Sequence, residues 1–131
     1  MKIPHINIFW FRRDLRVEDN HGLFKALQGG LPVLPLFIFD PAILSTLDRC
    51  DARVSFIYQQ LDAIYRQLRK SGSSLYVVHG EPEKVFADLV KRYSVEKVFA
   101  NEDYEPYGRM RDEKVRSLLI SHNVSTELVR D

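Results

Sequence analysis

Three short segments of the sequence concentrate charged side chains that could take part in binding. Arginines dominate residues 12–16, acids dominate residues 101–105, and Asp40 stands directly before Pro41. Each segment follows an apolar run that favours a β-strand. Carboxylates accept hydrogen bonds and guanidinium groups donate them, so the three segments together indicate a binding site. The alternative is that these charges cap helices and form exposed ion pairs, each of which stabilises a fold by about 0–1 kcal/mol.

Other sequence signals for chemistry are weak. No Gly-x-Gly-x-x-Gly follows the first apolar run, so the phosphate-binding loop of dinucleotide-binding domains is missing. The four histidines lack metal-ligand spacing, and the single cysteine, Cys50, has no second cysteine with which to form a disulfide or share a metal. We therefore predict neither a metal site nor a catalytic residue in this chain.

Length and charge narrow the classes of protein to which the chain can belong. Its 131 residues match one domain, assigned here to residues 1–131, because domains typically run about 100–200 residues. Nineteen basic residues face eighteen acidic ones, so the net charge of +1 creates no overall field toward DNA or membranes. No apolar run approaches the roughly 20 residues that span a bilayer, and no signal-peptide pattern opens the chain. We expect a soluble, cytoplasmic protein without membrane contact.

The apolar pattern predicts short strands that alternate with helices along the whole chain. Predicted strands cover residues 6–11, 33–39, 75–78, 97–100 and 124–129. Predicted helices are a short one capped by Asp19 or Asn20, a long one ending at Ser71–Gly72, one opened by Glu81–Pro82, and one over residues 106–122. The alternation is typical of βαβ units. The predicted fold class is α/β, a five-stranded parallel, doubly wound (Rossmann-like) sheet with helices on both faces.

The strand order decides where a ligand would bind, and crossover rules alone leave it open. An order of 3-2-1-4-5 places the reversal between the first and fourth strands, where the arginine and acidic segments would face each other across one crevice. Ligands of open parallel sheets bind outside the carboxyl ends of the strands at such a reversal. Aromatic residues of the first two strands are expected in the core, and Phe37, near the end of its strand, could also offer a face to a planar ligand.

Four motifs, in order along the chain, identify a family resemblance. They are Trp10-Phe11-Arg12-Arg13-Asp14-Leu15-Arg16 with Asp19-Asn20 and Leu23; Phe39-Asp40-Pro41; Arg53; and Glu105-Pro106-Tyr107-Gly108-Arg109 with Arg111-Asp112. The set resembles the photolyase/cryptochrome family over essentially the whole chain. The resemblance implies the amino-terminal α/β antenna domain of that family, whose sheet has the order 3-2-1-4-5.

The resemblance also implies a function for the protein to which such a domain belongs. A deoxyribodipyrimidine photolyase is a carbon–carbon lyase and flavoprotein that uses blue light and reduced FAD to split cyclobutane pyrimidine dimers in DNA. The antenna passes excitation to FAD, which sits in a helical carboxyl-terminal domain that we expect to be absent from this chain. The 131 residues alone would then be catalytically inactive. The alternatives are a cryptochrome-type blue-light photosensor and, third, a free-standing nucleotide-binding module.

Implied partners are the chain's own carboxyl-terminal FAD domain and, through it, UV-damaged DNA, with the protein expected to be a monomer. A deazaflavin or flavin antenna is favoured over methenyltetrahydrofolate, because folate-binding members can carry Asn-Glu where this chain has Tyr107-Gly108. Family members with a deazaflavin or flavin hold it in the crevice of this domain. The matching cofactor-binding positions here are Arg13, Phe37, Asp40, Arg53, Asp103, Glu105 and Gly108.

Overall fold

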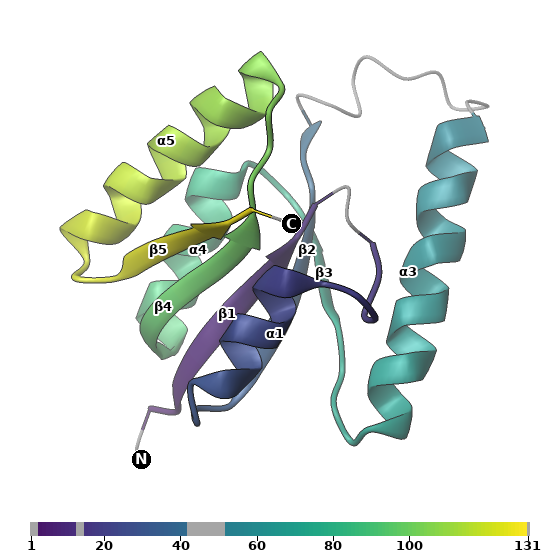
Figure 1. Cartoon of the computed structure of the whole chain (residues 1–131). Coiled ribbons are helices and arrows are strands. Elements are labelled where there is room, and N and C mark those ends of the chain that lie inside the picture. Colours follow the sequence, from purple (N-terminus) through teal and green to yellow (C-terminus); the bar gives the residue numbers. More distant parts are fainter. Residues whose placement is uncertain (1–2, 13–14, 42–51, 131) are drawn as a thin grey trace.

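The computed structural model describes residues 3–12, 15–41 and 52–130, and within these ranges five strands alternate with four helices (Figure 1). The elements are β1 His5–Phe11, α1 His21–Gln28, β2 Val33–Phe39, α3 Ala52–Lys70, β3 Tyr76–His79, α4 Pro82–Arg92, β4 Ser94–Asn101, α5 Pro106–Ser121 and β5 Ser125–Val129. The bounds of β2 are those predicted, and β1, β3 and β5 each begin within one residue of the prediction. Of the described helices, none is both long and apolar enough to cross a membrane.

The sheet confirms the predicted topology. Its order is β3-β2-β1-β4-β5, and each neighbouring pair runs parallel. The chain therefore builds outward from β1 through β2 to β3, then crosses back to β4 and β5. The strand order reverses between β1 and β4, so the carboxyl ends of these two strands border the expected crevice.

Helices cover both faces of the sheet, with α4 and α5 on one side and α1 and α3 on the other (Figure 1). The side chains of β1 alternate accordingly: Ile8 and Trp10 join the core under α4 and α5, whereas Phe9 and Phe11 join the core under α1 and α3. Burial on both faces explains why β1 and β2 are almost continuously apolar in sequence.

The β4 strand begins three residues earlier than its apolar pattern predicts. The backbone N–H of Ser94 donates to the carbonyl of Pro4 at 2.9 Å, and the pairing register shifts between Ile6 and Ile8. The buried Asn7 side chain bridges this irregularity, because its Oδ1 accepts the backbone N–H of Lys97 at 3.1 Å. Pairing with β1 therefore extends β4 beyond the segment that its own residues favour.

The short helix α1 packs tightly against the end of β4. Asn20 caps the helix, since its Oδ1 accepts the backbone N–H of Leu23 at 3.1 Å. A Cβ on Gly22 would lie 2.5 Å from Asn101 Oδ1 and 2.8 Å from Phe9 Cε1. The close approach of α1 to β1 and β4 at this point therefore requires glycine. This contact sets the rotation of α1 about its axis relative to the sheet. In that orientation Phe24, which lies on the same helix, is 59% exposed.

Candidate functional site

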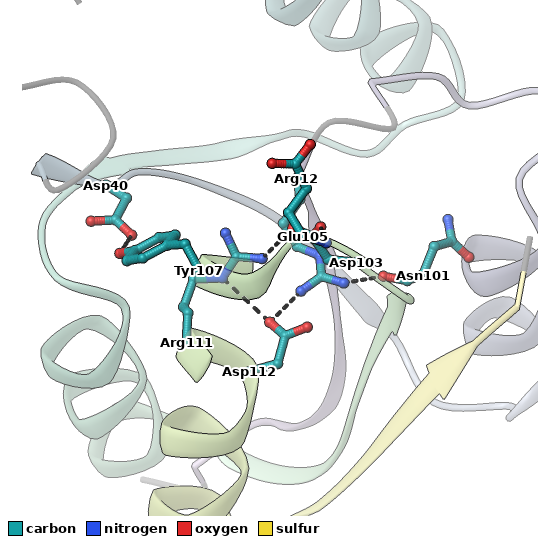
Figure 2. Close-up of polar contacts among 8 residues, drawn as sticks. All are labelled: Arg12, Asp40, Asn101, Asp103, Glu105, Tyr107, Arg111 and Asp112. Atoms are coloured by element: carbon teal, nitrogen blue, oxygen red, sulfur yellow. Dashed lines mark hydrogen bonds and ion pairs between the residues drawn. The ribbon is translucent and has the colours of Figure 1, made fainter. Parts of the chain in front are cut away.

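Arg12 bridges the point where the strand order reverses. It directly follows β1, and its Nη2 donates to the carbonyl oxygen of Asn101, the last residue of β4 (Figure 2). Its Nη1 donates to Asp112 Oδ1 at 2.5 Å, and the two side chains are only 6% and 8% exposed. A guanidinium that is planar and carries five donors suits such a junction, because one group can satisfy acceptors from two elements.

Three further charged residues join Arg12 in what we call the charge network: Asp103, Arg111 and Asp112. Arg111 Nη2 lies 3.0 Å from Asp103 Oδ2, and its Nε lies 3.3 Å from Asp112 Oδ1 (Figure 2). The Trp10 ring lies beneath both guanidinium groups, with centroid distances of 4.9 Å for Arg12 and 5.1 Å for Arg111. Two cations and two anions balance, so the network places no net charge inside the protein.

Asp103 fixes the loop between β4 and α5. Its Oδ1 accepts the backbone N–H of Glu105 at 3.1 Å, while Oδ2 accepts from Arg111. Burial acts to raise the pKa of Asp103, but the Glu105 hydrogen bond and the Arg111 charge outweigh it and leave the pKa below its ordinary value. A Cβ on Gly108 would lie within 2.9 Å of the Cγ and both oxygens of this carboxylate. Gly108 is thus the residue that lets Asp103 dock against α5.

Asp40 is tied to the same helix by a tyrosine. Tyr107 Oη donates to Asp40 Oδ2 at 2.5 Å, which links the carboxyl end of β2 to the first turn of α5 (Figure 2). Burial and the hydrogen bond to the Asp40 carboxylate raise the pKa of Tyr107 to about 12. Asp40 itself is 6% exposed, so the hydroxyl supplies a donor that a buried carboxylate needs.

A pocket of about 580 Å³ opens where α4 and α5 begin, beside Asp40. This volume lies within the range of small-molecule sites, about 300–1,000 Å³. The wall offers carboxylate acceptors, cationic donors and one aromatic ring, a set that fits a planar ring with hydrogen-bonding edges. Its lining residues are Asp40, Pro41, Glu81, Pro82, Glu83, Tyr107, Met110, Arg111 and Lys114.

The structure brings some of the predicted cofactor-binding residues together and separates others. Asp103, Glu105 and Gly108 meet at the start of α5, and Asp40 joins them through Tyr107. Phe37 is 7% exposed and packs edge-on against Phe39 in the core under α1 and α3, with ring centroids 4.9 Å apart. Arg53 lies exposed in the first turn of α3. Arg13 lies outside the described residues, and chromophore contact by any of the seven stays a prediction.

The predicted site residues do not include Tyr107, Arg111 or Asp112, although all three lie within the family motifs. Their spacing carries a usable signal, since Tyr107 and Arg111 are four residues apart on a helix that begins at Pro106. Residues so spaced lie on one helix face, here the face toward the carboxyl ends of the strands. Within residues 3–12, 15–41 and 52–130, no cluster of three or more His, Cys, Asp or Glu side chains could hold a metal ion.

Comparison of the sequence with known proteins gives a consistent result. The profile of a family described as DNA photolyase matches residues 7–131. A deoxyribodipyrimidine photo-lyase from Synechococcus sp. is 38% identical over 112 residues, which cover 86% of this chain and 23% of that protein. Cryptochrome-2 from Gallus gallus is 36% identical over 112 residues, covering 86% of this chain and 19% of that protein. The chain spans about a fifth of the length of these two relatives.

Solved structures with the same fold come from both branches. An archaeal photolyase from Sulfolobus tokodaii, crystallised with two FAD molecules, matches with a TM-score of 0.82 and 37% identity, over 95% of this chain and 29% of that one. A cryptochrome from Synechocystis sp. matches with a TM-score of 0.88 over 97% of this chain and 27% of that one. At 22% identity the cryptochrome shows only that the fold is shared.

Proposed function

Since this chain belongs to the DNA photolyase family and has the α/β fold of its amino-terminal domains, we propose that it is an antenna domain. It binds a second chromophore and passes excitation to FAD held by a carboxyl-terminal helical domain of a longer protein. That protein then repairs cyclobutane pyrimidine dimers with blue light. The chain itself contributes light capture and no covalent chemistry.

The observation that carries this proposal is the charge network at the strand-order reversal. Excitation transfer by dipole coupling depends on the distance and relative orientation of two chromophores, so an antenna site has to be rigid. Arg12, Asp112 and Arg111 fix the start of α5 against β1 and β4 through buried contacts. Supporting contacts of this kind hold ligand-binding groups in one geometry.

A flavin or deazaflavin is the chromophore that we propose for this site. The Sulfolobus tokodaii relative, 37% identical, carries two FAD molecules, which supports a flavin in the antenna position. Asp40 supplies an acceptor and Arg111 a donor toward the pocket, and the first-turn Tyr107 supplies an aromatic ring. A flavin ring carries both donors and acceptors on one edge, so it would complement this pair. When bound, the chromophore would supply light absorption alone.

We favour repair over photosensing as the activity of the longer protein. The photolyases from Synechococcus sp. and Sulfolobus tokodaii are 38% and 37% identical to this chain, whereas the bird and mammalian cryptochromes are 33–36% identical. The second candidate is therefore a cryptochrome-type photosensor that uses the same domain. Repair of dimer-containing DNA under blue light by the full-length protein would separate the two.

Chromophore titration tests the antenna proposal directly. The purified chain is mixed with riboflavin, FMN, FAD, a 5-deazaflavin and methenyltetrahydrofolate, and binding is followed by fluorescence anisotropy and calorimetry. We expect saturable binding of the flavin-type compounds and weaker binding of the folate. Glu105→Ala is expected to weaken flavin binding. The control is Glu113→Ala, which changes an exposed acid within α5, the helix that Glu105 precedes, and should leave flavin binding unchanged. A folded chain that binds no flavin-type compound would disprove the proposal.

A further inference from the structure

Trp10 lies close to the pocket, because the side chain of Arg111 belongs to the pocket wall and also lies over the Trp10 ring. The distance from Arg111 Cζ to the ring centroid is 5.1 Å. A chromophore atom in van der Waals contact with this Cζ, about 3.8 Å from it, would lie within about 9 Å of the centroid. A planar chromophore that touches Arg111 in the pocket is therefore a near neighbour of Trp10.

The Trp10 ring is held in one orientation by its surroundings. It is 3% exposed and meets the Phe86 ring edge-on, with centroids 5.0 Å apart and an interplanar angle of 70°. The Arg12 guanidinium lies over the same ring at 4.9 Å, and Asp112 accepts hydrogen bonds from Arg12 and Arg111. These partners come from α4, α5 and the end of β1, so three parts of the fold restrain the indole.

The spectral properties of indole complement those of a flavin. Trp10 is the only tryptophan among the 131 residues. Indole absorbs ultraviolet light at longer wavelengths than the tyrosine ring, and it emits in the near ultraviolet, where an oxidised flavin absorbs. Overlap of donor emission with acceptor absorption, a short distance and a fixed orientation are the conditions for excitation transfer by dipole coupling. Trp10 meets all three with respect to a flavin-type ring in the pocket.

We propose that Trp10 is an ultraviolet light collector of this domain, which passes its excitation to a flavin-type chromophore in the pocket. The inference rests on the antenna function proposed above and adds a second band of captured light to it. The transfer moves energy alone: no bond forms or breaks, and no electron or proton leaves the indole.

Electron transfer from the excited indole is the competing process, and the surroundings of Trp10 disfavour it. That process would leave an indole radical cation and a flavin radical. The cation would be buried, where a charge is costly, and would face the guanidinium groups of Arg12 and Arg111. Energy transfer creates no charge and therefore meets no such penalty.

The experiment excites the wild-type chain at the red edge of indole absorption, where tyrosine absorbs little, with and without saturating FMN. Binding of FMN is measured separately by calorimetry. We expect bound FMN to remove most of the Trp10 emission and to shorten its lifetime. Transient absorption should show excited FMN forming at the rate at which the excited indole decays.

Two altered proteins test whether Trp10 itself is the donor. Biosynthetic incorporation of 4-fluorotryptophan, a non-fluorescent analogue of nearly the same shape, changes this residue alone because the chain has one tryptophan. It should abolish the formation of excited FMN from the indole band without unfolding the protein. The matched control is the double variant Trp10→Phe with Phe24→Trp, which moves the indole to α1, on the face of the sheet opposite α5 (Figure 1). Transfer in that variant should be less efficient than in the wild type.

The outcomes distinguish the inference from the function on which it rests. Three results overturn the role of Trp10 and leave the antenna proposal standing: Trp10 emission unchanged by bound FMN, a flavin radical formed from the excited indole without excited FMN, or equal transfer from position 24. Failure of the folded wild-type chain to bind any flavin-type compound overturns both.

Discussion

Gly108→Ala is the substitution whose effect the structure defines most sharply. The backbone of Gly108 does not require glycine, because its φ lies outside the left-handed range. The constraint is spatial: an added Cβ would lie within 2.9 Å of the Cγ and both oxygens of Asp103. The carboxylate would have to move away from Arg111 and from the backbone N–H of Glu105.

The cost follows from the contacts that the carboxylate loses. Each hydrogen bond to a charged group contributes about 1.5–3 kcal/mol, and Asp103 accepts one from Arg111 and one from Glu105. Alanine recovers up to about 1 kcal/mol over glycine in a helix. We therefore expect the free energy of unfolding to fall by about 2–5 kcal/mol. For a chain of this length, that loss lowers the melting temperature by about 8–20 °C.

Thermal and urea unfolding of four proteins test this reasoning: wild type, Gly108→Ala, Asp103→Ala and the double variant. With Asp103 truncated, the new methyl group meets no carboxylate, so Gly108→Ala should become neutral or stabilising by up to about 1 kcal/mol. This change of sign is the decisive observation. Equal destabilisation by Gly108→Ala in both backgrounds would refute the assigned contact.

The remaining predictions concern charge. Asp112→Ala should cost about 3–5 kcal/mol in urea unfolding, because it leaves the guanidinium groups of Arg12 and Arg111 buried with one partner fewer. The control is Asp88→Ala, which removes the exposed ion pair between Asp88 and Arg92 and should lower the free energy of unfolding by at most about 0.5 kcal/mol. Equal losses of stability in the two variants would contradict the stabilising role given to the charge network. Asp103 has a lowered pKa, so its contribution to stability is complete above its ordinary pKa of 3.8 and is lost as the pH falls through the folded value. In Asp103→Asn, the free energy of unfolding should therefore decline less steeply between about pH 5 and 2 than it does in the wild type. A decline as steep as that of the wild type would show that another group causes the acid-dependent loss of stability.

The pattern of apolar residues and prolines predicted the secondary structure correctly wherever residues adjacent in sequence determine the backbone conformation. The seven-residue β2 strand and the proline-initiated helices α4 and α5 have the predicted starts. Strand and helix periodicities are short-range properties, and proline restricts its own backbone, so these features are readable from a few adjacent residues.

Local pattern failed where distant segments set the outcome. The β4 strand begins at Ser94 because β1 offers partners there, although Ser94 to Glu96 give no clear strand signal. Phe24 points outward because Gly22 fixes the rotation of α1 against Asn101. In both cases the deciding contact joins residues far apart along the chain.

By itself, the sequence determined the alternation of strands and helices, the burial of the central strands on both faces, and the family motifs. Those features are encoded by side-chain type at short spacing. Only the tertiary structure decided what the motif residues do: Arg12 meets Asn101 and Asp112, which lie 89 and 100 residues away. Gly108 serves the carboxylate of Asp103, and Tyr107 holds Asp40. The contacts of Arg12 and Tyr107 depend on distances across the folded sheet, which no spacing along the chain specifies.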